Sequence, residues 1–139
     1  MKKYILSLDE LSLFIDDILA NMKSGVIILR GDLASGKTTL VKNIVKQLGI
    51  KDDVTSPTFS LQQCYNDEVY HYDIYNHGVE HFISLGMLEE LEKDGLHFIE
   101  WGDEKLLEIL NNAGIDTLTI NIKKISDNKR EYKVEYAHA

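Results

Sequence analysis

The chain has 139 residues, 44% of them hydrophobic, which is enough for one domain, 1–139, with a buried core. Lysine and arginine total 15 against 23 aspartates and glutamates, so the net charge of -8 excludes the broad positive field of an unaided nucleic-acid binder. The single cysteine, Cys64, excludes an internal disulfide and fits a reducing compartment. No apolar run is long enough to cross a bilayer, so we expect a cytoplasmic protein with no membrane contact.

The first half of the chain predicts a strand, a helix, a second strand and a second helix. Ser7-Leu8-Asp9-Glu10 has the form of a capping box, and apolar residues then recur at helical spacing from Leu8 to Met22. The second strand covers the apolar run 26–30. The second helix covers 39–48, and Gly49 follows it in the usual C-terminal position.

Residues 31–38, between that strand and that helix, read Gly-Asp-Leu-Ala-Ser-Gly-Lys-Thr and fit the pattern G-x-x-x-x-G-K-S/T. In this setting successive backbone N–H groups curl around a phosphate, and the helix N-terminus adds partial positive charge. Lys37 is expected to reach the β- and γ-phosphates of a nucleotide, and the Thr38 hydroxyl to take one position on Mg²⁺. The sequence therefore predicts a phosphate-binding loop.

The second half of the chain predicts a hairpin, a helix interrupted at Gly86, a buried strand, a short helix and a closing hairpin. In chain order, these elements cover 59–65 with 69–75, 80–92, 96–99, 103–110, and 117–125 with 131–136. Strands and helices thus alternate around the loop. The predicted fold class is α/β, similar to P-loop NTPases, with a mixed central sheet flanked by helices in a three-layer sandwich.

Two carboxylates are candidates for chemistry beside the loop. Glu100 ends the buried strand, where an acidic residue of a P-loop protein holds Mg²⁺, although it could also be an exposed strand end. The two-residue period of a strand places His71, Asp73 and Tyr75 on one face. Asp73 could orient the attacking water or hold the metal shell, as phosphoryl transfer requires, or lie on the surface. For His71 we favour support of Asp73 or of the sheet over metal binding.

Four segments together resemble the TsaE (YjeE) family in order and spacing. They are Gly31 to Thr39, Val54-Thr55-Ser56-Pro57-Thr58-Phe59, His71-Tyr72-Asp73-Ile74-Tyr75 and Ile99-Glu100-Trp101. Members of that family are small bacterial ATPases that work with the TsaB and TsaD proteins to make threonylcarbamoyladenosine beside the tRNA anticodon. The resemblance implies the same activity here, with ATP and Mg²⁺ as cofactors, the TsaB–TsaD complex as partner, and tRNA reached only through that partner.

The resemblance also implies roles for individual residues. Lys37, Asp73 and Glu100 are implied as catalytic residues, and Thr38 and Glu100 as the Mg²⁺ ligands. ATP is implied to contact the loop, the residue after it and four residues distant in sequence, which together are Leu8, Asp9, Gly31, Asp32, Leu33, Ala34, Ser35, Gly36, Lys37, Thr38, Thr39, Asp103 and Arg130.

Three positions depart from the family pattern. Ala34 replaces a glycine usual in the loop, Asn76 stands where the family usually has arginine, and Gly102-Asp103 replaces a proline-containing continuation. The arginines of this chain are Arg30 and Arg130, and Arg30 is expected to point away from the loop. Because a positive group over the γ-phosphate accelerates P-loop enzymes, we expect slow hydrolysis by the isolated protein and activation by the partner.

Two other functions stay open. The domain could bind ATP and regulate a partner by changing shape, with hydrolysis incidental. A small-molecule kinase is less favoured, because such kinases close several arginines over the transferred group and this chain has two. A GTPase is less favoured still, since neither an N-K-x-D nor a D-x-x-G motif occurs.

Overall fold

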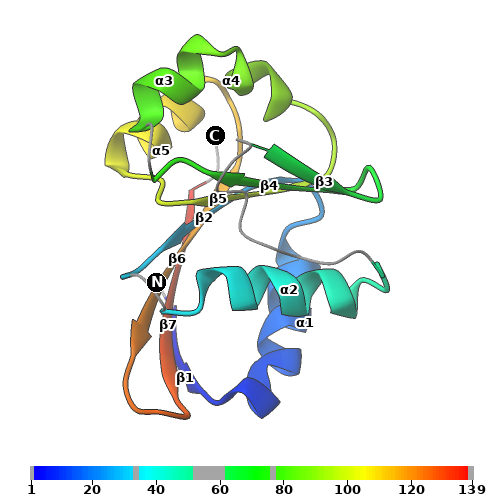
Figure 1. Ribbon diagram of the computed structural model, residues 1–139, viewed down its shortest axis with the longest axis vertical. Coiled ribbons are helices and arrows are strands. Elements are labelled where there is room, and N and C mark those ends of the chain that lie inside the picture. The colour runs from blue at the N-terminus through cyan, green and yellow to red at the C-terminus, as the bar shows by residue number, and fades with distance from the viewer. Residues whose placement is uncertain (1, 33–34, 52–61, 76–77, 138–139) are drawn as a thin grey trace.

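The structure is a computed structural model that describes residues 2–32, 35–51, 62–75 and 78–137. In this part of the chain, seven strands form one sheet in the order β1-β7-β6-β2-β5-β4-β3 (Figure 1). The strands are β1 (Lys2–Leu6), β2 (Gly25–Arg30), β3 (Gln62–Tyr65), β4 (Val69–Asp73), β5 (Leu96–Glu100), β6 (Thr117–Lys124) and β7 (Arg130–Ala137). The helices are the 3-10 helix η1 (Leu8–Glu10), α1 (Leu11–Asn21), α2 (Lys37–Gln47), α3 (Gly78–Ser84), α4 (Met87–Glu90) and α5 (Glu104–Asn112).

The sheet is mixed, as the sequence predicts. Strand β2 runs parallel to both β5 and β6, and β4 runs parallel to β5. The pairs β1–β7, β6–β7 and β3–β4 are antiparallel. Every residue of β5 is buried, which explains its apolar residues Leu96, Phe98 and Ile99, because a parallel strand covered on both faces has no solvent-exposed side. The carboxyl ends of β2, β5 and β4 meet at one edge of the sheet, where the phosphate-binding loop begins.

Helices cover both faces of the sheet and confirm the three-layer sandwich (Figure 1). On one face, α1 and α2 pack through Phe14 and Ile44 against sheet residues such as Ile27. On the other face, α3, α4 and α5 pack through Phe82, Met87 and Leu106 respectively against sheet residues such as Ile28. Ile27 and Ile28 are adjacent in β2 and fully buried, so the alternation of a strand places one in each core.

The capping box forms, but the apolar face of the first helix begins later than the sequence predicts. The Glu10 carboxylate accepts the Ser7 backbone N–H at 2.9 Å. The residues between them form the 3-10 helix η1, and α1 starts at Leu11. Because a 3-10 helix has three residues per turn, the side chains of η1 do not continue the apolar stripe of the α-helix. Leu8 is therefore 61% exposed, whereas Leu11 is buried.

The β3–β4 hairpin is confirmed, with one correction at its end. Asn66 and Asp67 have φ angles of 54° and 53°, as the central residues of a type I′ turn require, and the Glu68 N–H closes that turn on the Tyr65 oxygen at 3.1 Å. Strand β4 ends at Asp73 rather than Tyr75, because the Asp73 carboxylate accepts the Tyr75 backbone N–H at 2.9 Å and forms an Asx turn. His71 and Asp73 share one strand face, and Tyr75 lies beyond the strand.

The helices after β4 begin and end at capping residues. Gly86, at φ 77°, separates α3 from α4, as expected from its position in the predicted helix. Helix α5 begins at Glu104 rather than Asp103, because Asp103 is the N-cap and its carboxylate accepts the Leu106 N–H at 3.0 Å. Within the described ranges, no helix combines the length and apolar character needed to span a membrane.

Candidate nucleotide site

The phosphate-binding loop joins the end of β2 to the start of α2. Gly31 and Gly36 have φ angles of 153° and 113°, a region that glycine adopts readily and other residues rarely. A Cβ atom at Gly31 would lie 2.5 Å from the Ile122 backbone oxygen, so only glycine lets the loop pack this closely on β6. The backbone conformation thus explains both glycines of the motif. Leu33 and Ala34 lie outside the described residues.

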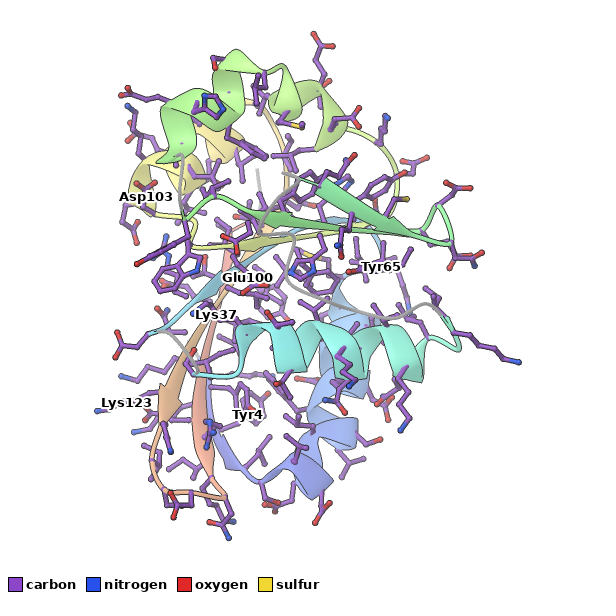
Figure 2. The ribbon with its side chains drawn as sticks, in the orientation of Figure 1. Tyr4, Lys37, Tyr65, Glu100, Asp103 and Lys123 are labelled. Atoms are coloured by element: carbon purple, nitrogen blue, oxygen red, sulfur yellow. The ribbon has the colours of Figure 1, made fainter. Side chains whose placement is uncertain are left out.

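Lys37 is the first residue of α2, and its side chain turns back over the loop (Figure 2). Its Nζ donates to the backbone oxygens of Gly31 and Asp32 at 2.7 and 2.9 Å. The same atom lies 3.9 Å from the centre of the Trp101 ring, within the range of a cation–π contact. Burial lowers the pKa of Lys37, although nearby carboxylates, Glu100 foremost, act in the opposite direction. The lysine is therefore held in place at the phosphate-binding end of the helix.

Glu100 is buried at the end of β5 and connects α2 with β4. The Thr38 hydroxyl donates to Glu100 Oε2 at 2.9 Å, and His71 Nε2 lies 2.5 Å from the same oxygen. A carboxylate only accepts, so the proton of the second bond is on His71 Nε2. On its other side, His71 Nδ1 lies 3.4 Å from the Tyr65 hydroxyl. The carboxylate that ends the buried strand is thus oriented by two hydrogen bonds and is not an exposed strand end.

Asp73 lies next to Glu100 across the sheet. The register of β4 and β5 pairs the two residues directly. Asp73 shares the strand face of His71, and its charge acts on Lys37, so it belongs to the same electrostatic environment. Two carboxylates, the Thr38 hydroxyl and one buried lysine therefore converge where β2, β4 and β5 end.

Oxygen atoms of this kind fit Mg²⁺, which prefers hard ligands and keeps several waters. Thr38 and Glu100 are the residues that would hold the ion, because their oxygen atoms already face each other. Asp73 lies one strand further along, directly beside Glu100 in the register of β4 and β5. Lys37 and the start of α2 supply positive charge for phosphate groups.

A hollow of about 570 Å³ lies beside the loop, within the size range of small-molecule sites. Its lining includes Leu8 and Asp9 from η1, Gly36 and Thr39 from the start of α2, and Arg130 from β7. The Arg130 Nε donates to the Ser35 backbone oxygen at 3.0 Å and so joins β7 to the loop. Residues distant in sequence are brought together here next to the phosphate-binding loop.

One residue expected to contact ATP does not line this hollow, and other expectations fall outside the described ranges. Asp103 caps α5 and does not line the hollow at Arg130. Arg30 points away from the loop, as expected, and binds the Gly102 backbone oxygen at 2.8 Å and the Glu104 carboxylate at 2.6 Å. The expectations for Asn76 and for the segment 54–59 fall on residues that the structure does not describe.

Two aromatic residues at the site were not predicted to act in it. Trp101 has a φ of 72°, rare for a large side chain, and packs on Lys37 on one side and Tyr75 on the other. Its place directly after Glu100 was the available signal. Tyr65 contacts His71 from the neighbouring strand β3. No local pattern marks that contact, because it depends on the pairing of β3 with β4.

This fold and loop define the class: an α/β protein of the P-loop NTPase-like type, with the loop between the central strand β2 and α2. The family model described as "Threonylcarbamoyl adenosine biosynthesis protein TsaE" matches residues 7–132. The chain belongs to the TsaE family, whose members are named for tRNA threonylcarbamoyladenosine biosynthesis.

Individual relatives agree with this assignment. The TsaE protein of Treponema pallidum (strain Nichols) is 36% identical over 115 residues, covering 81% of this chain and 82% of that protein. The TsaE protein of Bacillus subtilis (strain 168) is 38% identical over 112 residues, covering 76% of this chain and 66% of that protein. The crystal structure of YdiB from Bacillus subtilis matches with a TM-score of 0.69 at 29% identity, covering 99% of this chain and 86% of that one.

Proposed function

We propose that this protein is a Mg²⁺-dependent ATPase that supports a TsaB–TsaD partner complex in forming threonylcarbamoyladenosine on tRNA, in the cytoplasm. The observation that carries the proposal is the partly buried hydrogen bond from Thr38 to Glu100 beside Lys37, at the N-terminus of α2. This cluster places a lysine, a hydroxyl and a carboxylate where a P-loop protein grips the phosphates and metal of a nucleotide.

In the proposed reaction each group has one task. Lys37 and the backbone N–H groups at the start of α2 bind the β- and γ-phosphates. Thr38 and Glu100 would hold Mg²⁺, and the ion would supply positive charge near the phosphates. Asp73 orients the attacking water. The hollow lined by Leu8, Asp9 and Arg130 receives the nucleoside. Because Arg130 is already bonded to the loop backbone, we propose slow turnover that partner docking accelerates.

The test compares wild type with Glu100→Gln in the presence and absence of purified TsaB–TsaD. We expect Glu100→Gln to lower steady-state hydrolysis about a hundredfold, with less than about a tenfold change in ATP affinity, because the loop still grips the phosphates. Wild-type hydrolysis should rise at least several-fold on saturation with the partner. Titration calorimetry measures the affinity, and circular dichroism checks that the variant is folded.

Three outcomes decide the proposal. Unaltered turnover in Glu100→Gln would reduce Glu100 to a structural residue. A fast isolated enzyme whose rate stays flat across the partner titration would contradict activation by the partner. If the variant binds ATP, cannot hydrolyse it and still supports formation of the modified nucleoside, the domain is a regulatory ATP-binding subunit, and hydrolysis is not its function.

A further inference from the structure

The half of the sheet formed by β6, β7 and β1 has a helix on only one face (Figure 1). Residues such as Ile120 and Val134 point into the core with α1 and α2. In the described part of the chain, the apolar core under α3, α4 and α5 takes no side chain from these three strands, and only the start of β6, where Thr117 and Thr119 are buried and α5 makes contact, is covered on this face. Further along these strands the alternate residues, such as Asn121, Lys123 and Lys133, are exposed on a sheet face without a covering helix, and Figure 2 shows Lys123 pointing away from α1 and α2.

Basic residues gather on this uncovered face. The strand register aligns Lys3, Lys133 and Arg30, with Asn121 between the last two, in a row across β1, β7, β6 and β2. Lys123 lies in the next row, roughly 7 Å along the strands. We call the surface made by Lys3, Arg30, Lys123 and Lys133 the basic sheet face. It is a local positive area in a chain of net charge -8.

The positive charge of the basic sheet face exceeds what its own carboxylates neutralise. Lys3 forms an ion pair with the nearly buried Glu131 at 3.0 Å. The hydrogen bond from Lys3 is the main cause that lowers the pKa of Glu131, and the charges of Lys133 and Lys123 add to it. Lys3, Lys123 and Lys133 thus all act on Glu131, whereas Arg30 is paired with Glu104 outside these strands. A further carboxylate from another molecule would find two exposed ammonium groups here at a small desolvation cost.

The same face opens into a hollow that reaches the phosphate-binding loop. The hollow has a volume of about 830 Å³, and its lining includes Lys123 and Lys133 together with Gly31, Asp32 and Ser35. Gly31 of the loop packs closely on the backbone of β6, so the phosphate-binding loop and the basic sheet face are in direct contact. A group seated on the basic sheet face would therefore touch the loop that grips the phosphates.

We propose that the basic sheet face is the docking surface for a carboxylate-bearing face of a protein partner, which then contacts the phosphate-binding loop. This inference rests on the proposed function, in which a partner accelerates turnover. A protein fits better than RNA, because Glu131 and Glu135 lie among the lysines and the Ile5 side chain beside them is 50% exposed. A phosphate backbone favours an unbroken positive surface, whereas protein interfaces mix charged and apolar contacts.

The test uses Lys123→Glu/Lys133→Glu, with Lys23→Glu/Lys46→Glu as the matched control. All four lysines are exposed, and the two pairs change the net charge equally. Binding of immobilised TsaB–TsaD is measured at low and high salt, together with ATP affinity and basal hydrolysis. We expect the first pair to weaken partner binding by about tenfold or more at low salt, with smaller loss at high salt. Basal hydrolysis and ATP affinity should match wild type.

The outcomes separate this inference from the proposed function. If wild type binds TsaB–TsaD and both double variants bind equally well, the basic sheet face is not the docking surface, and the partner assignment survives. Equal loss in both pairs also overturns it, because net charge would then be the cause. If wild type does not bind TsaB–TsaD, the partner assignment fails and this inference fails with it. Binding of purified tRNA at physiological salt that is lost only in the first pair would make the face an RNA surface.

Discussion

At the scale of single residues, the site depends on one buried carboxylate that accepts hydrogen bonds from two side chains. Glu100 accepts hydrogen bonds from Thr38 and His71 on the same oxygen, so its orientation is determined from both α2 and β4. Groups that orient a metal ligand from behind typically affect metal affinity about 10- to 100-fold. His71 is fully buried and does not itself face the loop, which makes it a positioning residue.

His71→Ala is expected to raise the Mg²⁺ concentration for half-maximal ATP hydrolysis by about tenfold or more, because Glu100 loses a donor. His71→Gln should restore most of the wild-type dependence, since its amide can also donate. The measurement is hydrolysis across a Mg²⁺ titration. His97→Gln is the control, because His97 is the other histidine buried within the described ranges and bonds to Tyr72 and Lys93 instead. An unchanged Mg²⁺ requirement in His71→Ala would leave His71 with a purely structural role.

At the scale of elements, the chemistry comes together because parallel strands end at one edge. The loop follows β2, Glu100 ends β5 and Asp73 ends β4. Ligand sites in open parallel sheets lie outside the carboxyl ends of the strands for this reason. Helix α5 follows β5 on the opposite face from α2, and its N-cap, Asp103, belongs to that helix. Proximity in sequence to Glu100 therefore does not place Asp103 at the loop.

Asp103→Ala is expected to lower the free energy of unfolding by about 1 kcal/mol, because the Leu106 N–H loses its capping acceptor. ATP affinity should be unchanged. Urea unfolding measures the stability, and titration calorimetry measures the affinity. Asp103→Asn, which can still cap, should recover most of the lost stability. A clear loss of ATP affinity in the folded Asp103→Ala protein would instead return Asp103 to the nucleotide site.

At the scale of the whole molecule, stability should depend on a histidine buried in the sheet. His97 Nε2 lies 2.8 Å from the Lys93 backbone oxygen, and His97 Nδ1 lies 2.8 Å from the Tyr72 hydroxyl. A neutral ring satisfies both contacts, with one nitrogen donating and the other accepting. Burial is the main cause that lowers the pKa of His97 from its ordinary value of 6.5. The folded protein therefore disfavours the protonated ring.

The sign of the pH dependence follows from this shift. Below pH 6.5 the unfolded chain takes up a proton at His97 that the folded protein does not, so stability falls as the pH falls. We expect the wild-type melting temperature to drop between pH 7.5 and pH 5.5, and His97→Gln to show a smaller drop. The window lies above the range where carboxylates titrate. Identical drops in both proteins would show that His97 does not contribute.

The sequence by itself determined the elements and the loop. Local signals placed the capping box, the β3–β4 turn at Asn66 and the break at Gly86, because each depends on a few neighbouring residues. The phosphate-binding loop was equally local, since its glycines, Lys37 and Thr38 are contiguous. The α/β class followed from the order of the elements. The end of β4 was misplaced by two residues, because the Asp73 side chain overrides the alternating pattern through a single turn.

Only the tertiary structure decided what lies beside what. Tyr65 contacts His71 and His71 contacts Glu100 because β3, β4 and β5 pair in that order, which no local pattern specifies. The basic sheet face exists because β7, near the end of the chain, pairs with β1 at its start. The paired residues are more than a hundred positions apart in the sequence. A sequence pattern predicts on which face of its own helix or strand a residue lies. Contacts between distant elements arise from the free energy of packing the whole chain, and that is why they appear only in the folded molecule.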